Sequence, residues 1–191
     1  MALGEAFIPH HDFCVGNARI HNNVFVRVKG AIRYWGNQGE IRGDRVFNNT
    51  IHSSLSPFTN LNRKGYHWDD QHIWNNLCVA TTGPYTRGGA FVYCDYNVIG
   101  GAIVAMGFSN NRMRHKTLEA WRAATGLDAH SVQFKSLRFR ASDPKRPEDF
   151  RLPLDSPLRK EPMLGRFGKE MRGAYSFDAI VKGRPLGTAQ K

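Results

Sequence analysis

The sequence predicts an all-β fold, a right-handed parallel β-helix of about three to four coils followed by a short C-terminal capping helix and an irregular tail. Three observations lead to this prediction. An asparagine-centred segment recurs at intervals of 26, 27 and 21 residues. Glycine-initiated strand patterns lie between the copies. The repeat ends near Gly100, where a helical pattern follows.

The repeated segment has the pattern apolar, any, any, Asn, any, apolar, and a repeat of this length must stack on its neighbours to bury its apolar face. The copies lie in residues 17–29, 43–55, 70–82 and 91–101, and their key asparagines are Asn23, Asn49, Asn76 and Asn97. Strand side chains alternate in and out, so both apolar positions point inward only if the chain bends near the asparagine. Asparagine tolerates such a bend. We therefore predict a structural ladder of stacked asparagine side chains.

The same spacing predicts two apolar columns inside the coils. One column contains Ile20, Val46, Ile73 and Cys94, and the other contains Phe25, Ile51, Cys78 and Ile99. These columns place two of the three cysteines in the core. An odd number of cysteines, none in a Cys-x-x-Cys pair, does not indicate a disulfide framework.

A second strand in each coil is expected to begin after a glycine, at residues 30–34, 65–69 and 89–93. The unequal offsets of these strands from the asparagine column imply loops of different length. Residues 55–64 and 81–88 contain proline and turn residues, so both are expected to be loops. Loops on a rigid scaffold are where binding residues tend to lie.

A helix is predicted at residues 117–125, with Thr117 as the N-cap and Gly126 just after the C-terminus. A solenoid needs caps over its open ends, so we expect this helix to cover or flank one end of the coils. The chain divides accordingly into coils at residues 1–111 and a helix and tail at residues 112–191.

The net charge of +11 is uneven, being +2 over residues 1–111 and +9 over residues 112–191. A basic surface is suited to acidic partners, and acidic polysaccharide is the partner we expect. Nucleic acid is not expected, because the repeats show no stripe of basic and aromatic residues. A membrane partner is not expected either, because no apolar run is long enough to span a bilayer. The sequence gives no oligomeric state.

Four segments carry a resemblance to a known family. Cys94–Asn97 is similar to a Ser-Asp-Tyr-Asn motif, and Trp121–Ser131 looks like a helix followed by a Gly-x-Asp-x-His-Ser turn. Asp149–Pro157 resembles an Asp-Phe-Arg-Leu…Ser-Pro signature, and Gly173–Tyr175 resembles a closing Gly-Ala-Tyr-Glu. These motifs are found in bacterial secreted proteins of the pectate-lyase-like superfamily of right-handed β-helices. The usual Asp-Pro-x-Phe of that family is replaced here by Lys135–Phe139.

The resemblance implies a protein that is extracellular or at the cell surface in its full-length form, although this chain shows no signal peptide. Its relatives have more coils, which favours the interpretation that the chain is the C-terminal portion of a longer protein. The superfamily includes polysaccharide lyases and hydrolases that bind sugar along the outside of the coils. The chain is accordingly expected to act on acidic polysaccharide, as a lyase more than a hydrolase, or to be a non-catalytic glycan-binding or structural module.

The best local constellation for catalysis is His67, Asp69 and Asp70, with Arg33 expected on the preceding coil beside them. A lyase needs a base and a cation, and a hydrolase needs two carboxyl groups. If Trp68 points inward, His67 and Asp69 share the outer face of a strand. The alternative is that these are strand-end and turn residues bonded to one another.

Tyr34, Trp35, Tyr85 and Arg87 are candidates for substrate binding, because aromatic faces suit pyranose rings and arginine suits an acidic sugar. No cofactor is predicted and no metal spacing is recognised, although calcium is left open. His130 is interpreted as a structural residue that bonds the backbone near Asp128.

Overall fold

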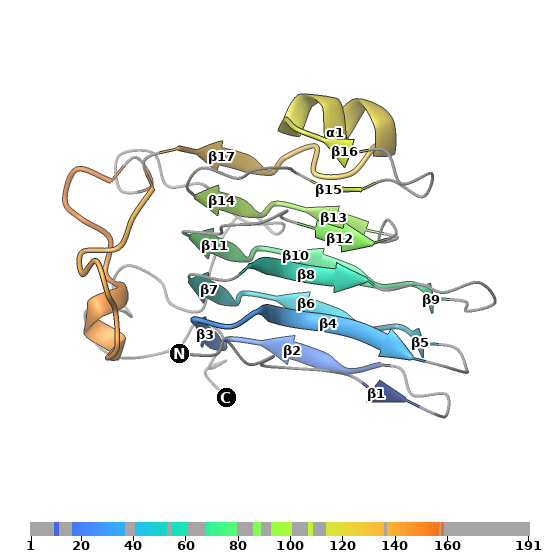
Figure 1. Cartoon of the computed structure of the whole chain (residues 1–191), viewed down its shortest axis with the longest axis horizontal. Coiled ribbons are helices and arrows are strands. Elements are labelled where there is room, and N and C mark those ends of the chain that lie inside the picture. Colours follow the sequence, from blue (N-terminus) through green and yellow to red (C-terminus); the bar gives the residue numbers. More distant parts are fainter. Residues whose placement is uncertain are drawn as a thin grey trace, which may run out of the picture.

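The computed structural model describes residues 10–11, 17–36, 41–52, 55–60, 68–79, 86–88, 93–100, 107–108, 114–135, 137–156 and 158. Short strands in this part of the chain stack as successive coils (Figure 1). Each coil passes through up to three sheets in a fixed order, and strands of neighbouring coils pair in parallel and in register. The chain is mostly β, and this arrangement is compatible with a parallel β-helix.

Three parallel sheets form the sides of the stack. Sheet 1 contains β2 (Arg19–His21), β6 (Arg45–Phe47), β10 (His72–Trp74) and β13 (Tyr93–Asp95). Sheet 2 contains β3 (Val24–Val26), β7 (Thr50–His52), β11 (Leu77–Val79), β14 (Val98–Gly100) and β17 (Val132–Phe134). Sheet 3 contains β1 (His10–His11), β4 (Gly30–Gly36), β8 (Ser56–Asn60) and β12 (Thr86–Gly88).

Two smaller strand pairs lie beside these sheets. A parallel pair is formed by β5 (Ile41–Arg42) and β9 (Trp68–Asp69). An antiparallel pair is formed by β15 (Gly107–Phe108) and β16 (Arg114–His115), just before α1 (Leu118–Thr125). A 3₁₀ turn at Pro147–Phe150 lies in the tail.

The two predicted apolar columns are confirmed by the strand register. Successive partners are Ile20, Val46, Ile73 and Cys94 in sheet 1, and Phe25, Ile51, Cys78 and Ile99 in sheet 2. All of these side chains except Phe25 are buried, and together they form one core cluster that also contains Ile32 and Phe58 of sheet 3. The core therefore fills the interior of the coils, with every sheet contributing to it.

The side chains of the four key asparagines form a continuous hydrogen-bonded ladder inside the stack. Asn23 donates from its backbone nitrogen and its Nδ2 to Asn49 Oδ1, both at 3.1 Å. Asn49 donates in the same way to Asn76 Oδ1, and Asn76 to Asn97 Oδ1, each at 3.0 Å. The bonds from one asparagine to the next all run toward the C-terminal end of the stack, so the last asparagine needs an acceptor beyond it.

That acceptor is provided by the turn after α1. The backbone nitrogen of Asn97 donates to Ser131 Oγ at 2.8 Å, and Ser131 Oγ donates to Asp128 Oδ1 at 2.5 Å. Trp121 Nε1 donates to Asp128 Oδ2 at 2.9 Å. A carboxylate accepts hydrogen bonds only, so the buried Asp128 is suited to end a ladder whose bonds from asparagine to asparagine all run in one direction.

The bend from sheet 1 into sheet 2 is made by the residue before each ladder asparagine. Asn22, Asn48, Asn75 and Tyr96 all have positive φ, between 54° and 58°. Asparagine tolerates this left-handed conformation far better than tyrosine does. The first asparagine of each Asn-Asn pair therefore turns the chain, and the second forms the ladder.

The second strand expected after Gly30 is confirmed as β4, whereas residues 65–67 and 89–92 of the next two lie outside the described residues. In sheet 3, β4 pairs with β8 and β8 pairs with β12, and both β8 and β12 lie inside segments expected to be loops. The strand β8 was not predicted because it contains Pro57, and proline is disfavoured in a central strand. The pairing of β8 with β12 begins at Phe58, one residue after the proline.

The predicted helix is confirmed as α1, with both of its caps. Thr117 Oγ1 accepts from the backbone nitrogen of Ala120 at 3.1 Å, and Gly126 is left-handed with φ 69°. Leu118 and Trp121 are buried and belong to the core cluster of the coils. The helix lies at one end of the stack (Figure 1) and covers its core, as expected.

The tail after β17 covers the outer side of sheet 2. Outward residues of sheet 2, including Leu77, Val79 and Val98, pack with Leu137, Phe139, Phe150, Leu152 and Leu158 in a second apolar cluster. Figure 1 shows this tail running beside the coils on the left. Sheet 2 is thus buried on both faces, whereas side chains on the outer face of sheet 1, such as those of Arg45 and His72, are partly exposed.

Candidate functional site

The four predicted catalytic residues are not brought together by the described part of the structure. His67 lies outside the described residues. Asp69 is in β9, paired with Arg42, whereas Arg33 is in β4, paired with Thr59. The two strands belong to different sheets, because Asp69 precedes the turn into sheet 1 and Arg33 follows sheet 2. The side chains of Arg33 and Asp69 are not described.

The predicted substrate-binding residues map to sheet 3. Tyr34 pairs with Asn60, Trp35 pairs with His10, and Arg87 pairs with Thr59. Thr59 therefore lies in register between Arg33 and Arg87. Tyr85 lies outside the described residues, and the side chains of the other three are not described.

Asp70 is the one predicted catalytic residue with a described side chain, and it belongs to an ionic cluster on the outer face of sheet 1. Arg45 Nη2 donates to Asp70 Oδ2 at 2.8 Å, and His72 Nε2 lies 2.7 Å from Asp70 Oδ1. The ring of Tyr93 lies 5.2 Å from that of His72. The hydrogen bond from Arg45, with help from His72, lowers the pKa of Asp70.

A second carboxylate–imidazole pair lies further along the same face. Asp95 Oδ2 lies 2.7 Å from His130 Nδ1, and Asp95 Oδ1 accepts from the backbone nitrogens of His130 at 2.6 Å and Tyr96 at 2.8 Å. The rings of Tyr96 and His130 stack at 4.6 Å with an interplanar angle of 11°. His130 was predicted to be a structural residue bonded to the backbone near Asp128, and the structure shows its ring bonded to Asp95 of the last coil.

Three aromatic rings stack along the outer face of sheet 1. His21, Phe47 and Trp74 are register partners, with ring centroids 4.7 Å apart at each step and nearly parallel planes. Each ring covers the face of the next, and Trp74 is only 7% exposed. Sugar stacking needs open ring faces, so this column stabilises the coils rather than offering a platform for sugar.

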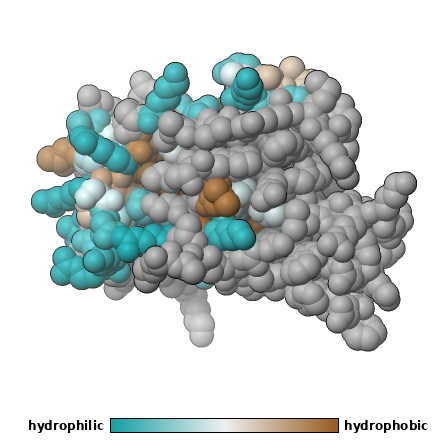
Figure 2. Space-filling model, viewed as in Figure 1, coloured by the Kyte–Doolittle hydropathy of each residue, from teal (hydrophilic) through white to brown (hydrophobic). Residues whose placement is uncertain are grey.

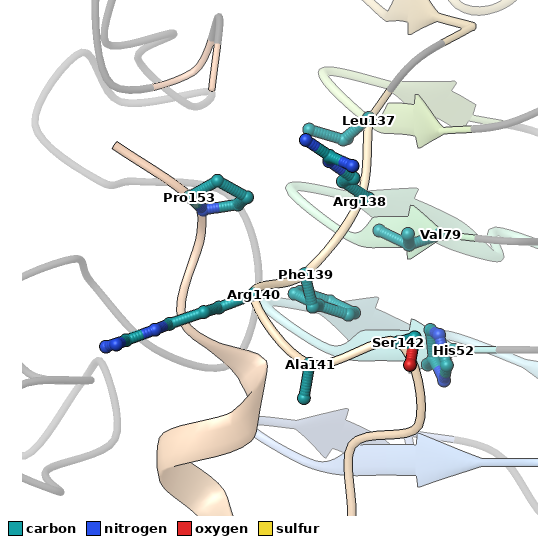
Figure 3. Close-up of a pocket in the computed structure, with 9 residues that line it drawn as sticks. All are labelled: His52, Val79, Leu137, Arg138, Phe139, Arg140, Ala141, Ser142 and Pro153. Atoms are coloured by element: carbon teal, nitrogen blue, oxygen red, sulfur yellow. The ribbon is translucent and has the colours of Figure 1, made fainter. Parts of the chain in front are cut away.

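A pocket of about 370 Å³ lies between the tail and sheet 2 (Figure 3). It is lined by His52, Val79, Leu137, Arg138, Phe139, Arg140, Ala141, Ser142 and Pro153. Burial and the charge of Arg27 lower the pKa of His52, so this imidazole is neutral at pH 7. In Figure 3 the side chain of Arg140 extends away from Phe139 and His52. The lining therefore combines apolar side chains and a neutral imidazole with two arginines, Arg138 and Arg140.

The basic tail forms a hydrophilic surface on the side of the molecule seen at the left of Figure 2. Arg138, Lys145 and Arg146 are each more than 70% exposed, and each lies within 4 Å of an aspartate. Exposed pairs of this kind contribute little binding energy by themselves. These three basic residues of the tail thus lie on an open surface beside acidic partners.

The described residues form neither a metal-ligating cluster nor a membrane-spanning helix. No group of three or more His, Cys, Asp or Glu side chains is placed there to hold a metal ion. No helix there is both long and apolar enough to cross a membrane. The chain matches no family model, no curated protein and no solved structure.

Sequence reasoning missed Arg45, His72 and Tyr93, although the repeat contains the signal for them. Each residue directly precedes an inward apolar residue of sheet 1, so the same register that aligns the core also aligns this outer column. The pair of Asp95 and His130 had no such signal, because 35 residues separate its members.

Proposed function

We propose that this chain is a right-handed parallel β-helix of the pectate-lyase-like superfamily that interacts with acidic polysaccharide along the outer face of sheet 1. We also propose that the chain is part of a secreted or cell-surface carbohydrate-active enzyme. Parallel sheets in register, the asparagine ladder and the four family-like motifs support the fold. The net charge of +11 supports an acidic partner.

The observation that carries the proposal is the ionic cluster of Arg45, Asp70 and His72 on adjacent coils. Side chains fixed on rigid strands hold a charged pattern at low entropic cost. Arginine recognises carboxylates through paired hydrogen bonds, so a uronate can compete with Asp70 for the guanidinium of Arg45. Successive coils are about 4.8 Å apart, which gives a linear polymer a regular track along the stack.

The charge state of Asp70 favours a lyase over a hydrolase. A hydrolase needs one carboxyl group that stays protonated at its working pH. Arg45 and His72 lower the pKa of Asp70, which keeps it ionised. A lyase instead needs a base and a cation, and this face carries both kinds of group.

A non-catalytic glycan-binding module is the second candidate, and one observation favours it. Arg45, Asp70 and His72 bond to one another. A face whose charged groups already bond to one another can bind a polymer without catalysing a reaction on it. The two candidates share the binding surface and differ only in whether a bond is broken.

Binding of polygalacturonate and alginate, measured by calorimetry against neutral dextran, tests the shared proposal. We expect both uronans to bind, dextran not to bind, and added salt to weaken the affinity. Arg45→Gln should weaken uronan binding at least about tenfold, the value of one charge-assisted hydrogen bond. Lys145→Gln makes the same charge change on the exposed tail and should have little effect.

Equal loss of affinity in the two variants would show that net charge, rather than this face, attracts the polymer. Absence of uronan binding by the folded chain would contradict the proposed function. In parallel, the ultraviolet absorbance of unsaturated product distinguishes the lyase from the module.

A further inference from the structure

His130, in the turn after α1, is anchored to the outer face of the last coil by bonds to Asp95 and by stacking on Tyr96. The carboxylate of Asp95, whose side chain is 9% exposed, bonds both the ring nitrogen Nδ1 and the backbone nitrogen of His130. The ring of Tyr96 stacks against the imidazole. Arg122 fixes the turn from the other end by donating to the carbonyls of Asp128 and Ser131.

This anchored imidazole is nevertheless open to solvent. The side chain of His130 is 60% exposed, whereas the carboxylate that holds it is buried. A purely structural link between the turn and the coil is already provided by the backbone bonds of Asp128 to Cys94 and of Val132 to Asn97. The link between the turn and the coil therefore does not depend on the imidazole. Its exposure to solvent and its bond to Asp95 suggest a second role.

We propose that His130 is the general base of a β-elimination on a uronate polymer, with Asp95 as its positioning residue. This inference rests on the proposed function, since it names the reactive residue of the same outer face. A buried carboxylate at Nδ1 sets the tautomer and orientation of an imidazole and stabilises the imidazolium that forms. Histidine is also the side chain best suited to accept a proton near neutral pH.

The elimination balances without a further reactant. Nε2 of His130 takes the proton on the carbon α to the uronate carboxylate, and the electron pair of that C–H bond forms a carbon–carbon double bond to the neighbouring carbon. The bond from that neighbouring carbon to the glycosidic oxygen breaks, and its pair stays on the oxygen, which takes a proton from water. The imidazolium returns its proton to solvent. Arg122 adds positive charge beside the turn, where negative charge develops on the substrate.

The variant His130→Asn distinguishes a general base from a residue that only links the turn to the coil. In His130→Asn the side-chain amide can still donate to Asp95 Oδ2 in place of Nδ1, but it cannot accept a proton. Lys145→Gln, on the exposed tail and away from this turn, is the control. Asp95→Asn keeps the shape of the positioning residue and removes its charge.

The full chain and each variant are mixed with polygalacturonate and with alginate, and both binding and unsaturated product are measured. We expect His130→Asn to bind within about twofold of the parent and to lose at least about 100-fold in elimination rate, a typical contribution of a general base. Lys145→Gln should stay close to the parent in both measurements. Nitrogen-15 NMR should show Nδ1 protonated in the parent, and Asp95→Asn should shift this tautomer.

The outcomes separate the two proposals. A parent chain that binds uronan but forms no unsaturated product overturns the role of His130 and leaves the binding function standing. A His130→Asn variant that keeps the parent's elimination rate also overturns it. A parent that binds neither polymer overturns the proposed function, and the inference falls with it.

Discussion

The ladder asparagines are the residues on which the stacking of coils depends most strongly. Asn76 is fully buried, and its Nδ2 donates to the carbonyls of Val46 and Trp74 as well as to Asn97 Oδ1. Its Oδ1 accepts two bonds from Asn49. One amide thus satisfies buried polar groups from three successive coils, which is a larger role than a turn residue usually has.

Asn76→Ala should lower the free energy of unfolding by about 3 kcal/mol or more, because several buried groups lose their partner at once. Asn23→Ala is the matched control, since Asn23 is exposed at the first rung and should cost about 1 kcal/mol or less. Urea unfolding followed by circular dichroism measures both. Equal losses at the two positions would mean that ladder burial is not the source of the stability.

The pH dependence of stability should carry a signature of Asp128. Burial raises the pKa of Asp128 above its ordinary value of 3.8, although its hydrogen bonds from Ser131 and Trp121 oppose the shift. The folded chain then holds a proton over a pH window in which the unfolded chain releases it. The stability that Asp128 contributes is fully present below pH 3.8 and is lost as the pH rises through that window.

Urea unfolding of the parent and of Asp128→Asn across the acidic to neutral range tests this sign. The parent's free energy of unfolding, minus that of the variant, should fall as the pH rises, because the variant has no carboxyl group to titrate there. A difference that instead rises with pH would show that the folded chain prefers the charged carboxylate.

Sequence spacing predicted residues that repeat and missed residues that do not. The apolar columns and the stacked asparagines were predictable because each coil places the same residue type at the same rung. Tyr96 takes the left-handed position that asparagine fills in the other coils, and nothing in its type predicts that. The bond from Asp95 to His130 joins the repeat to a turn outside it, so no periodicity indicates it.

At the scale of elements, the tail is held on sheet 2 by close packing at one glycine. A Cβ on Gly100 would lie 2.9 Å from Leu137 Cβ, a distance that requires the tail to move. Leu137 is buried in the cluster that joins the tail to the coils. Gly100 is therefore the point where the backbone of β14 lets the tail approach.

Gly100→Ala should destabilise the chain by about 1–3 kcal/mol through overpacking, and adding Leu137→Ala should relieve part of that cost. Gly126→Ala is the control, because a Cβ on Gly126 would meet no atom within 4 Å and the cost there comes only from its positive φ. Thermal unfolding and limited proteolysis of the tail report the effect. Additive losses from Gly100→Ala and Leu137→Ala would contradict the predicted contact.

The elements that sequence predicted well are those with local signals. The helix was predictable from its caps. The strands β8 and β12 were not, because proline and turn residues surround them and their pairing comes from the neighbouring coils. The assignment of residues 65–69 to the second strand led us to expect Asp69 beside Arg33. In the structure these two residues belong to strands of different sheets.

At the scale of the whole molecule, the surfaces of the stack differ in packing and charge. Sheet 2 is covered by the tail, and the end of the stack beyond β14 is closed by α1 and the turn that terminates the ladder. Sheet 1 carries two carboxylate–imidazole pairs and an arginine on one outer face. This distribution of packing and charge is the reason for assigning polysaccharide to sheet 1.

Hydrogen exchange of the full chain, with and without saturating polygalacturonate, is the sharpest test of that assignment. We expect added protection in β10, β13 and the turn at residues 128–131, with the tail over sheet 2 unchanged. The Arg45→Gln variant should lose that protection at the same polymer concentration. Protection confined to the tail or to sheet 3, with β10 and β13 unaffected, would contradict the assignment.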